Sequence, residues 1–110
     1  MHFCLTGQYT PPALNHMMDN PTSSRYEAAK SLIETAGGKL ISMYSMPADG
    51  PGVLVIFDVE PTAAQAISGV VVASGTLHHV QLKLLLTQDE VLQVRKKASE
   101  LRGAFKPPGK

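Results

Sequence analysis

The sequence predicts an α+β domain in which helices cover one face of a four-stranded antiparallel sheet. Three observations support this prediction. The 110 residues are a typical length for one domain. The apolar residues fall into short segments, some alternating as in strands and others recurring at helical spacing. These segments follow the order strand, helix, strand, strand, helix, strand, with one further helix at the end.

The first strand is expected over His2–Tyr9, where apolar and polar residues alternate. The run Thr10-Pro11-Pro12 ends it, because proline has no N–H to donate to a sheet. Residues Ala13 to Met18 are predicted to form one or two helical turns. Asn20-Pro21 then breaks this segment, since a residue before proline avoids the helical region.

The clearest helix begins after Ser24. Ser24 and Glu27 have the spacing of a capping box, in which each side chain binds a backbone N–H of the other residue. Gly37-Gly38 supplies the left-handed residue that ends the helix. Between these signals the apolar residues recur at helical spacing on one face. They are Ala28, Ala29, Leu32, Ile33 and Ala36.

An antiparallel hairpin is expected next. Strands over Lys39–Met46 and Val53–Val59 are joined by the turn Pro47–Gly52, a short loop that contains Asp-Gly.

Pro61 suits the first position of a second helix, which reaches about Ser74. The β-branched run Val70–Val72 and the nearby Gly69 favour a strand instead. We prefer the helix, because the apolar residues of this segment keep a helical stripe.

The chain ends with a strand and a helix. The strand is expected over Leu77–Leu86, and Thr87 with Glu90 forms a second capping box that opens a helix to about Arg102. We therefore expect one domain over residues 1–102. The C-terminal tail, residues 103–110, is expected to be loose or to dock on a neighbour through Phe105.

This order is that of the ferredoxin-like split β-α-β fold, with both helices on one face and the first strand beside the third and the fourth. The strand after the turn is apolar on both sides, because Val53, Val55 and Phe57 face one way while Leu54 and Ile56 face the other. Exposing either set would forgo about 1.5–3 kcal/mol for each large side chain. The chain has no element left for a second layer, so we expect the sheet of a second copy to cover this face in an isologous homodimer.

The rest of that second face is expected to be more polar. If Phe3 and Leu5 pack under the helices, the alternation places Val80, Leu82 and Leu84 inside as well. The open face is then apolar along its centre and polar toward one edge. Its polar or small residues would be His2, Cys4, Thr6, Gln8, His79, Gln81 and Lys83.

Four segments together resemble the GYD-domain family. They are GQYT at residues 7–10, EAAKSLIETAGGKLISMY at 27–44, VLVIFDVEPTAAQA at 53–66 and LTQDEVLQVRKKA at 86–98. The resemblance covers most of residues 3–100. It implies the ferredoxin-like fold and a similarity in shape to the dimeric α/β-barrel proteins, and it implies no particular activity.

The chain departs from the family at the Gly-Tyr-Asp tripeptide that precedes the third strand. Asp49-Gly50-Pro51-Gly52 stands there instead, without a tyrosine, so a role of the family's tyrosine and aspartate does not transfer, except loosely to Asp49. This stretch lacks the lysine and the following helix of a phosphate-binding loop, so it is expected to be a simple turn.

His2, Cys4 and His79 form a candidate metal site. His78 and His79 are neighbours on a strand and are expected to point to opposite faces, with His79 on the open face near His2 and Cys4. Such a set suits zinc or copper. The alternative, which we favour, is a set of unrelated edge residues in which Cys4 is a small buried hydrophobe. No cofactor is therefore expected.

The resemblance to dimeric α/β-barrel proteins also implies an enzyme as an alternative. Some of those proteins oxidise aromatic or polyketide substrates without a cofactor, in a pocket between sheet and helices. The competing interpretation is that the tyrosines simply pack and hydrogen-bond at the rim. The candidate catalytic residues are Tyr9, His16, Tyr44 and His79, and the candidate ligand-binding residues are Asn15 and Gln81.

Composition narrows the function classes. The net charge is +1 and the only basic run is Arg95-Lys96-Lys97, so nucleic-acid binding is poorly supported. One cysteine excludes an intramolecular disulfide. No apolar run approaches the roughly 18 residues of a membrane span, and the first residues lack the features of a signal peptide. A bacterial-type cytoplasmic protein is the default expectation.

The sequence therefore predicts a small homo-oligomeric binding or assembly module whose ligand it does not identify. One alternative is a cofactor-independent enzyme, monooxygenase- or isomerase-like, that acts on an aromatic or dicarbonyl substrate. The second alternative is a protein that binds a transition metal. The partner common to all three is a second copy of the chain.

Overall fold

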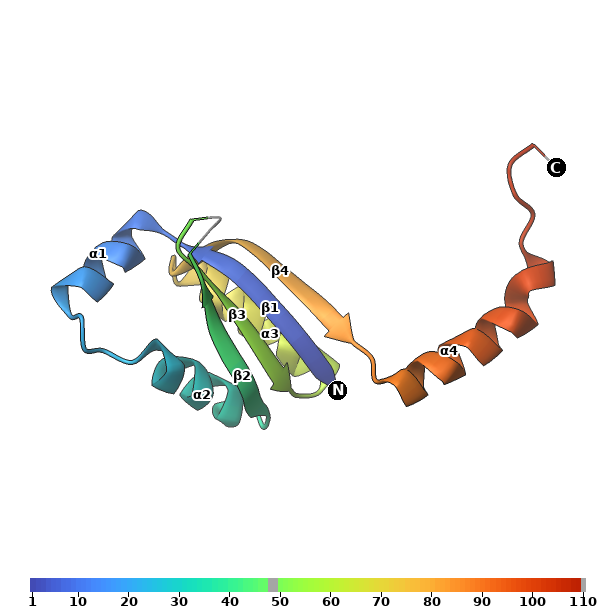
Figure 1. Cartoon of the computed structure of the whole chain (residues 1–110), viewed down its shortest axis with the longest axis horizontal. Coiled ribbons are helices and arrows are strands. Elements are labelled where there is room, and N and C mark those ends of the chain that lie inside the picture. The colour runs from blue at the N-terminus through green and yellow to red at the C-terminus, as the bar shows by residue number, and fades with distance from the viewer. Residues whose placement is uncertain (48–49, 110) are drawn as a thin grey trace.

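The computed structural model describes residues 1–47 and 50–109, and its elements follow the predicted order (Figure 1). Asp49, in the turn that replaces the family tripeptide, lies outside these residues. The strands are β1 (His2–Tyr9), β2 (Lys39–Met46), β3 (Gly52–Asp58) and β4 (Leu77–Leu85). The helices are α1 (Pro11–Asp19), α2 (Arg25–Thr35), α3 (Pro61–Ala73) and α4 (Gln88–Leu101), followed by a 3-10 turn over Arg102–Ala104.

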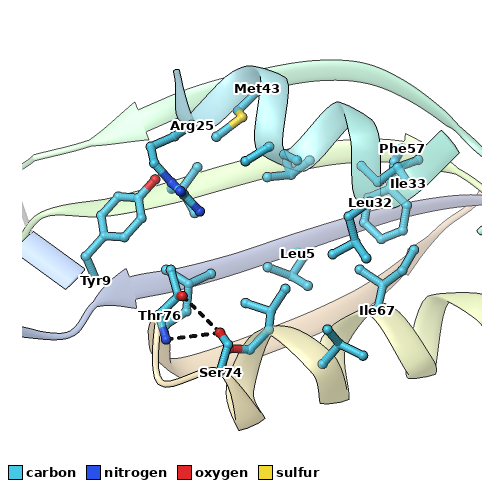
Figure 2. Close-up of a pocket in the computed structure, with 17 residues that line it drawn as sticks. Leu5, Tyr9, Arg25, Leu32, Ile33, Met43, Phe57, Ile67, Ser74 and Thr76 are labelled. Atoms are coloured by element: carbon cyan, nitrogen blue, oxygen red, sulfur yellow. Dashed lines mark hydrogen bonds between the residues drawn. The ribbon is translucent and has the colours of Figure 1, made fainter. Parts of the chain in front are cut away.

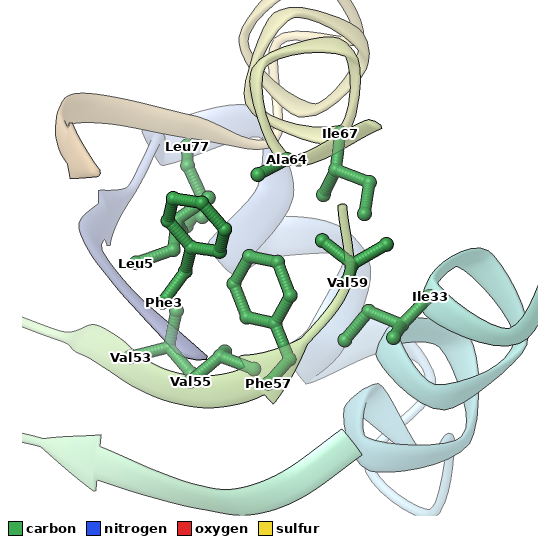
Figure 3. Close-up of a cluster of buried hydrophobic side chains, with 10 residues drawn as sticks. All are labelled: Phe3, Leu5, Ile33, Val53, Val55, Phe57, Val59, Ala64, Ile67 and Leu77. Carbon is green, nitrogen blue, oxygen red and sulfur yellow. The ribbon is translucent and has the colours of Figure 1, made fainter. Parts of the chain in front are cut away.

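The four strands form one antiparallel sheet in the order β2-β3-β1-β4, which confirms the predicted place of β1 between β3 and β4. On one face of this sheet α2 packs against β2 and α3 against β4. Phe57, from β3, is the most deeply buried large side chain, and it stacks obliquely on Phe3 of β1. Figure 3 shows the core that they anchor. Its members are Phe3, Leu5, Ile33, Val53, Val55, Phe57, Val59, Ala64, Ile67 and Leu77.

The helix starts follow from side chains that cap backbone N–H groups. The Thr87–Glu90 capping box is complete, with bonds of 3.1 and 2.9 Å, and Ser24 Oγ accepts the Glu27 N–H at 3.1 Å. Glu60 caps α3 by accepting the Ala63 N–H, so the segment after it is a helix and not a strand. These side chains replace bonds that the first turn of a helix lacks.

Helix α1 begins earlier than predicted. Thr10 Oγ1 accepts the Ala13 N–H, so the prolines that end β1 also form the first turn of α1. Proline suits this position because the first N–H groups of a helix have no partner within the helix.

A β-bulge in β4 changes the predicted alternation. Gln81 lies opposite Thr6 and His78 opposite Gln8, so two residues of β4, His79 and Val80, match one residue of β1. His79 takes a positive φ of 52°, typical of such an insertion. The His78 and His79 rings lie 4.5 Å apart, so the expectation that they point to opposite faces is wrong. The extra residue places His78, opposite Gln8, where His79 was expected.

Helix α4 extends away from the sheet and its two covering helices (Figure 1). Consequently the structure measures 59 × 33 × 23 Å, and its radius of gyration is 17.9 Å, against about 13 Å for a compact domain of this length. Val94 and Leu101 of α4 remain more than half exposed. Among the described residues, no helix combines the length and the apolar character that crossing a membrane requires.

Candidate functional site

A cavity of about 190 Å³ lies between the helix-covered face of the sheet and the helices α2 and α3 (Figure 2). Its walls are almost entirely aliphatic or aromatic, and polar groups gather at one end. The residues that line it are Leu5, Tyr9, Arg25, Ala28, Ala29, Leu32, Ile33, Met43, Val53, Val55, Phe57, Ile67, Val70, Val71, Ser74, Thr76 and Leu77.

The cavity exists because the two helices pack over opposite edges of the same sheet face, α2 on β2 and α3 on β4. On the α2 side, Ala28 and Ala29 are too short to reach across to α3. At one end Ile33 and Ile67 close the space over Phe57 (Figure 3). The other end, where β1 leads into α1, stays open.

The open end carries the polar groups of the cavity: Tyr9, Arg25, Ser74 and Thr76 (Figure 2). Arg25 is the first residue of α2, directly after the capping Ser24. The Ser74 and Thr76 hydroxyl oxygens lie 2.9 Å apart, and the Thr76 N–H donates to Ser74 Oγ at 3.3 Å. We call these four residues the polar mouth.

Tyr9 is a half-buried phenol beside the Arg25 side chain (Figure 2). Burial raises the pKa of Tyr9, and the neighbouring Arg25 opposes this rise only in part. The phenol therefore stays protonated at neutral pH and is able to donate a hydrogen bond into the cavity.

A second cavity, of about 380 Å³, adjoins the polar mouth beneath α1. It shares Arg25 and Thr76 with the first cavity, and His16 and Asn20 also line it. Arg25 thus stands between the two cavities.

The structure separates the candidate residues expected from the sequence. Tyr9 lines the apolar cavity and His16 the adjoining one, so these two lie in the same region. Tyr44 pairs with Leu54, and Gln81 with Thr6, which places both on the opposite face of the sheet. Asn15 is an exposed residue of α1, and His79 occupies the bulge in β4.

The sequence patterns did not predict a role for Arg25, Ser74 or Thr76. Ser74 and Thr76 lie in the connection from α3 to β4 and have no motif around them. Arg25 had one usable signal, since a cation in the first turn of a helix opposes the helix dipole and calls for another explanation.

The three candidate metal ligands do not come together. His2 pairs with Leu85, six residues along β4 from His79, which corresponds to about 20 Å. Among residues 1–47 and 50–109, no three side chains of the His, Cys, Asp and Glu types cluster closely enough to hold a metal ion. Cys4 is a partly buried free thiol on the face opposite the cavity.

The uncovered face of the sheet has the apolar centre that the sequence predicts. Leu54 and Ile56 of β3 pair across the sheet with Thr6 and Cys4 on one side, and Tyr44 lies beside Leu54 on the other. Tyr44 is 62% exposed. These five residues form the centre of the uncovered face, which we call the open face.

Comparisons with known proteins agree with this architecture. The family model described as the GYD domain matches residues 3–94. The crystal structure of 30S ribosomal protein S6 from Thermotoga maritima is similar, with a TM-score of 0.55 and 14% sequence identity. The match covers 89% of this chain and 96% of that protein. At this identity the likeness concerns the fold alone. No curated protein matches the chain.

Proposed function

The chain belongs to the GYD-domain family, and we propose that it is a homodimeric module that binds a small apolar molecule in the cavity between sheet and helices. The observation that carries this proposal is the cavity itself. Its walls are apolar and its polar groups gather at the open end. Ligand sites are typically apolar hollows with a few convergent polar groups.

The size of the cavity sets the size of the ligand. An apolar cavity of about 150 Å³ in another protein stays dry and binds benzene. The cavity here, at about 190 Å³, suits one aromatic ring or a short branched chain. A ligand of this size gains dispersion contacts with these apolar walls.

Binding is favoured over catalysis by the chemistry of the polar mouth. An enzyme of the cofactor-independent type needs a base that is poised near neutral pH. Tyr9 has a raised pKa and is a donor rather than a base. His16 lines the adjoining cavity and not the apolar one.

The homodimer is supported by the open face. Leu54 and Ile56 lie at its centre and are only partly buried within one chain. Covering them with the same surface of a second copy removes both from water and satisfies two-fold symmetry.

Filling the cavity tests the binding function. Benzyl alcohol, a single-ring neutral probe, is expected to bind with a dissociation constant of about 1 mM, since so small a ligand makes few contacts. Titration followed by amide NMR should shift the signals of residues around the cavity. Ala29→Leu, which projects into the cavity, should abolish these shifts.

The matched control is Ala66→Leu, on an exposed position of α3. It makes the same chemical change on a helix without entering the cavity, and binding should persist. Absence of benzyl alcohol shifts in the unchanged protein, or equal binding by both variants, contradicts the proposal.

A further inference from the structure

We propose that the ligand carries a carboxylate, which Arg25 binds at the polar mouth while the apolar part of the molecule fills the cavity. This inference rests on the proposed function, because the cavity must first accept the apolar part. It adds the charge of the ligand and the residue that recognises it.

Among the residues that the structure describes, Arg25 is the only charged one that lines the cavity. Its guanidinium has no carboxylate within 4.0 Å among the described residues, whose ion pairs are Met1–Asp58, Lys30–Glu34 and Lys97–Glu100. A guanidinium offers paired donors that match the two oxygens of a carboxylate. The polar end of the cavity therefore carries a solvent-exposed positive charge that no described carboxylate pairs with.

The position of Arg25 is unfavourable with respect to the helix dipole, and its side chain interacts with the Tyr9 phenol, whose pKa it lowers in part. Arg25 is the first residue of α2, where the helix dipole already concentrates positive charge. A cation in the first turn of a helix is unfavourable, whereas an anion bound there interacts favourably with both the guanidinium and the dipole. A bound carboxylate would explain why a cation occupies this position.

Neutral donors surround the same point. The raised pKa of Tyr9 keeps its phenol protonated. The phenol is therefore able to donate a hydrogen bond to an anion and carries no negative charge that would repel it. Thr76 adds a hydroxyl donor on the other side of the mouth (Figure 2), whereas the neighbouring Ser74 hydroxyl donates to the Val71 carbonyl oxygen at 2.7 Å. One guanidinium with neutral hydroxyl donors matches the single charge of a carboxylate better than the double charge of a phosphate.

The experiment compares benzoate with benzyl alcohol, which have similar rings but differ in charge. In the unchanged protein benzoate should bind roughly five- to tenfold more tightly, as expected for one charge-assisted contact that is open to water. The preference should shrink as salt is raised, because salt screens an exposed ion pair.

Arg25→Gln should abolish the preference for benzoate, so that this variant binds benzoate and benzyl alcohol about equally. Arg25→Lys should restore it in part, since lysine keeps the charge but not the paired donors. Arg95→Gln, which removes the same charge from the distant α4, is the control and should keep the full preference. Thermal unfolding of each variant confirms that it is folded.

The outcomes separate the two proposals. If neither probe binds, the cavity is not a ligand site and both proposals fail. If benzyl alcohol binds as tightly as benzoate, or if Arg25→Gln keeps the preference, the carboxylate inference fails while the apolar binding function stands. Hexanoate and 1-hexanol serve as a second pair, so that the role of charge is measured independently of the shape of the ring.

Discussion

At the scale of single residues, Gly38 shows how closely the chain passes itself between α2 and β2. A Cβ atom at this position would overlap the Asp58 carbonyl oxygen and lie 2.9 Å from Val59 Cβ. Both neighbours are fixed by the fold, and one is backbone. We predict that Gly38→Ala lowers the free energy of unfolding by about 2 kcal/mol, the usual cost of overpacking.

Gly69→Ala is the matched control. Gly69 lies inside α3, and a Cβ there meets nothing within 4 Å. Alanine should raise the free energy of unfolding by about 1 kcal/mol, because it favours the helix over the unfolded chain. Urea unfolding of both variants measures the two effects. If Gly38→Ala is as stable as the parent, the connection between α2 and β2 is able to move away from the end of β3 without cost.

The face on which a single side chain lies was harder to predict than the elements or the fold. The sequence places Phe3, Leu5 and Phe57 correctly in the core, because simple alternation holds along β1 and β3. It misplaces His79, because one inserted residue reverses the alternation beyond it and leaves no mark in the local sequence. Arg25 joins Tyr9 only through the packing of α2, which the sequence does not specify.

At the scale of elements, the capping box of α4 makes the stability of this helix depend on pH. Hydrogen bonds from the Thr87 backbone and side chain hold the pKa of Glu90 below its ordinary value. A carboxyl group with a lowered pKa in the folded helix stabilises it above the unfolded pKa. This contribution is lost as the pH falls through the lower, folded value.

We therefore predict that helical circular dichroism declines as the pH falls from about 5 to 3, with part of the decline due to Glu90. Glu90→Gln should lack that part, because glutamine still accepts the backbone bond and does not titrate. Glu100→Gln, near the other end of α4, should behave like the parent. Identical pH curves for the parent and Glu90→Gln would exclude a role of this carboxylate.

Elements were more predictable than residues because their ends carry local signals. Thr87 with Glu90 and Ser24 with Glu27 mark helix starts that the structure confirms. The same local signals do not tell where a helix packs. Consequently, the start of α4 is predicted within one residue, whereas its separation from the sheet is not.

At the scale of the whole molecule, the order of elements determined the fold. Two β-α-β units with right-handed connections leave few arrangements, so the strand order and the helix-covered face followed from the sequence. The cavity did not follow, because it depends on the space left between α2 and α3. That space is set by three-dimensional packing and not by any pattern along the chain.

The open face and the apolar side of α4 are both apolar surfaces without a covering element in the described part of the chain. The open face lies at the centre of the sheet, whereas Val94 and Leu101 of α4 lie on an extension. Interfaces of stable dimers bury about 800 Å² per partner around a well-packed apolar centre. The open face offers such a centre at Leu54 and Ile56, so we propose that a dimer forms through it.

We predict that the protein is a dimer at micromolar concentration. Ile56→Lys should convert it to a monomer, because a lysine at the centre of the interface would be buried without a partner. Tyr44→Lys changes a side chain that is 62% exposed, so it should weaken the dimer without affecting folding. Val94→Lys, on α4, is the matched control and should remain dimeric. Analytical ultracentrifugation measures all four proteins. A monomeric parent would refute the dimer, and a dimer broken only by Val94→Lys would move the interface to α4.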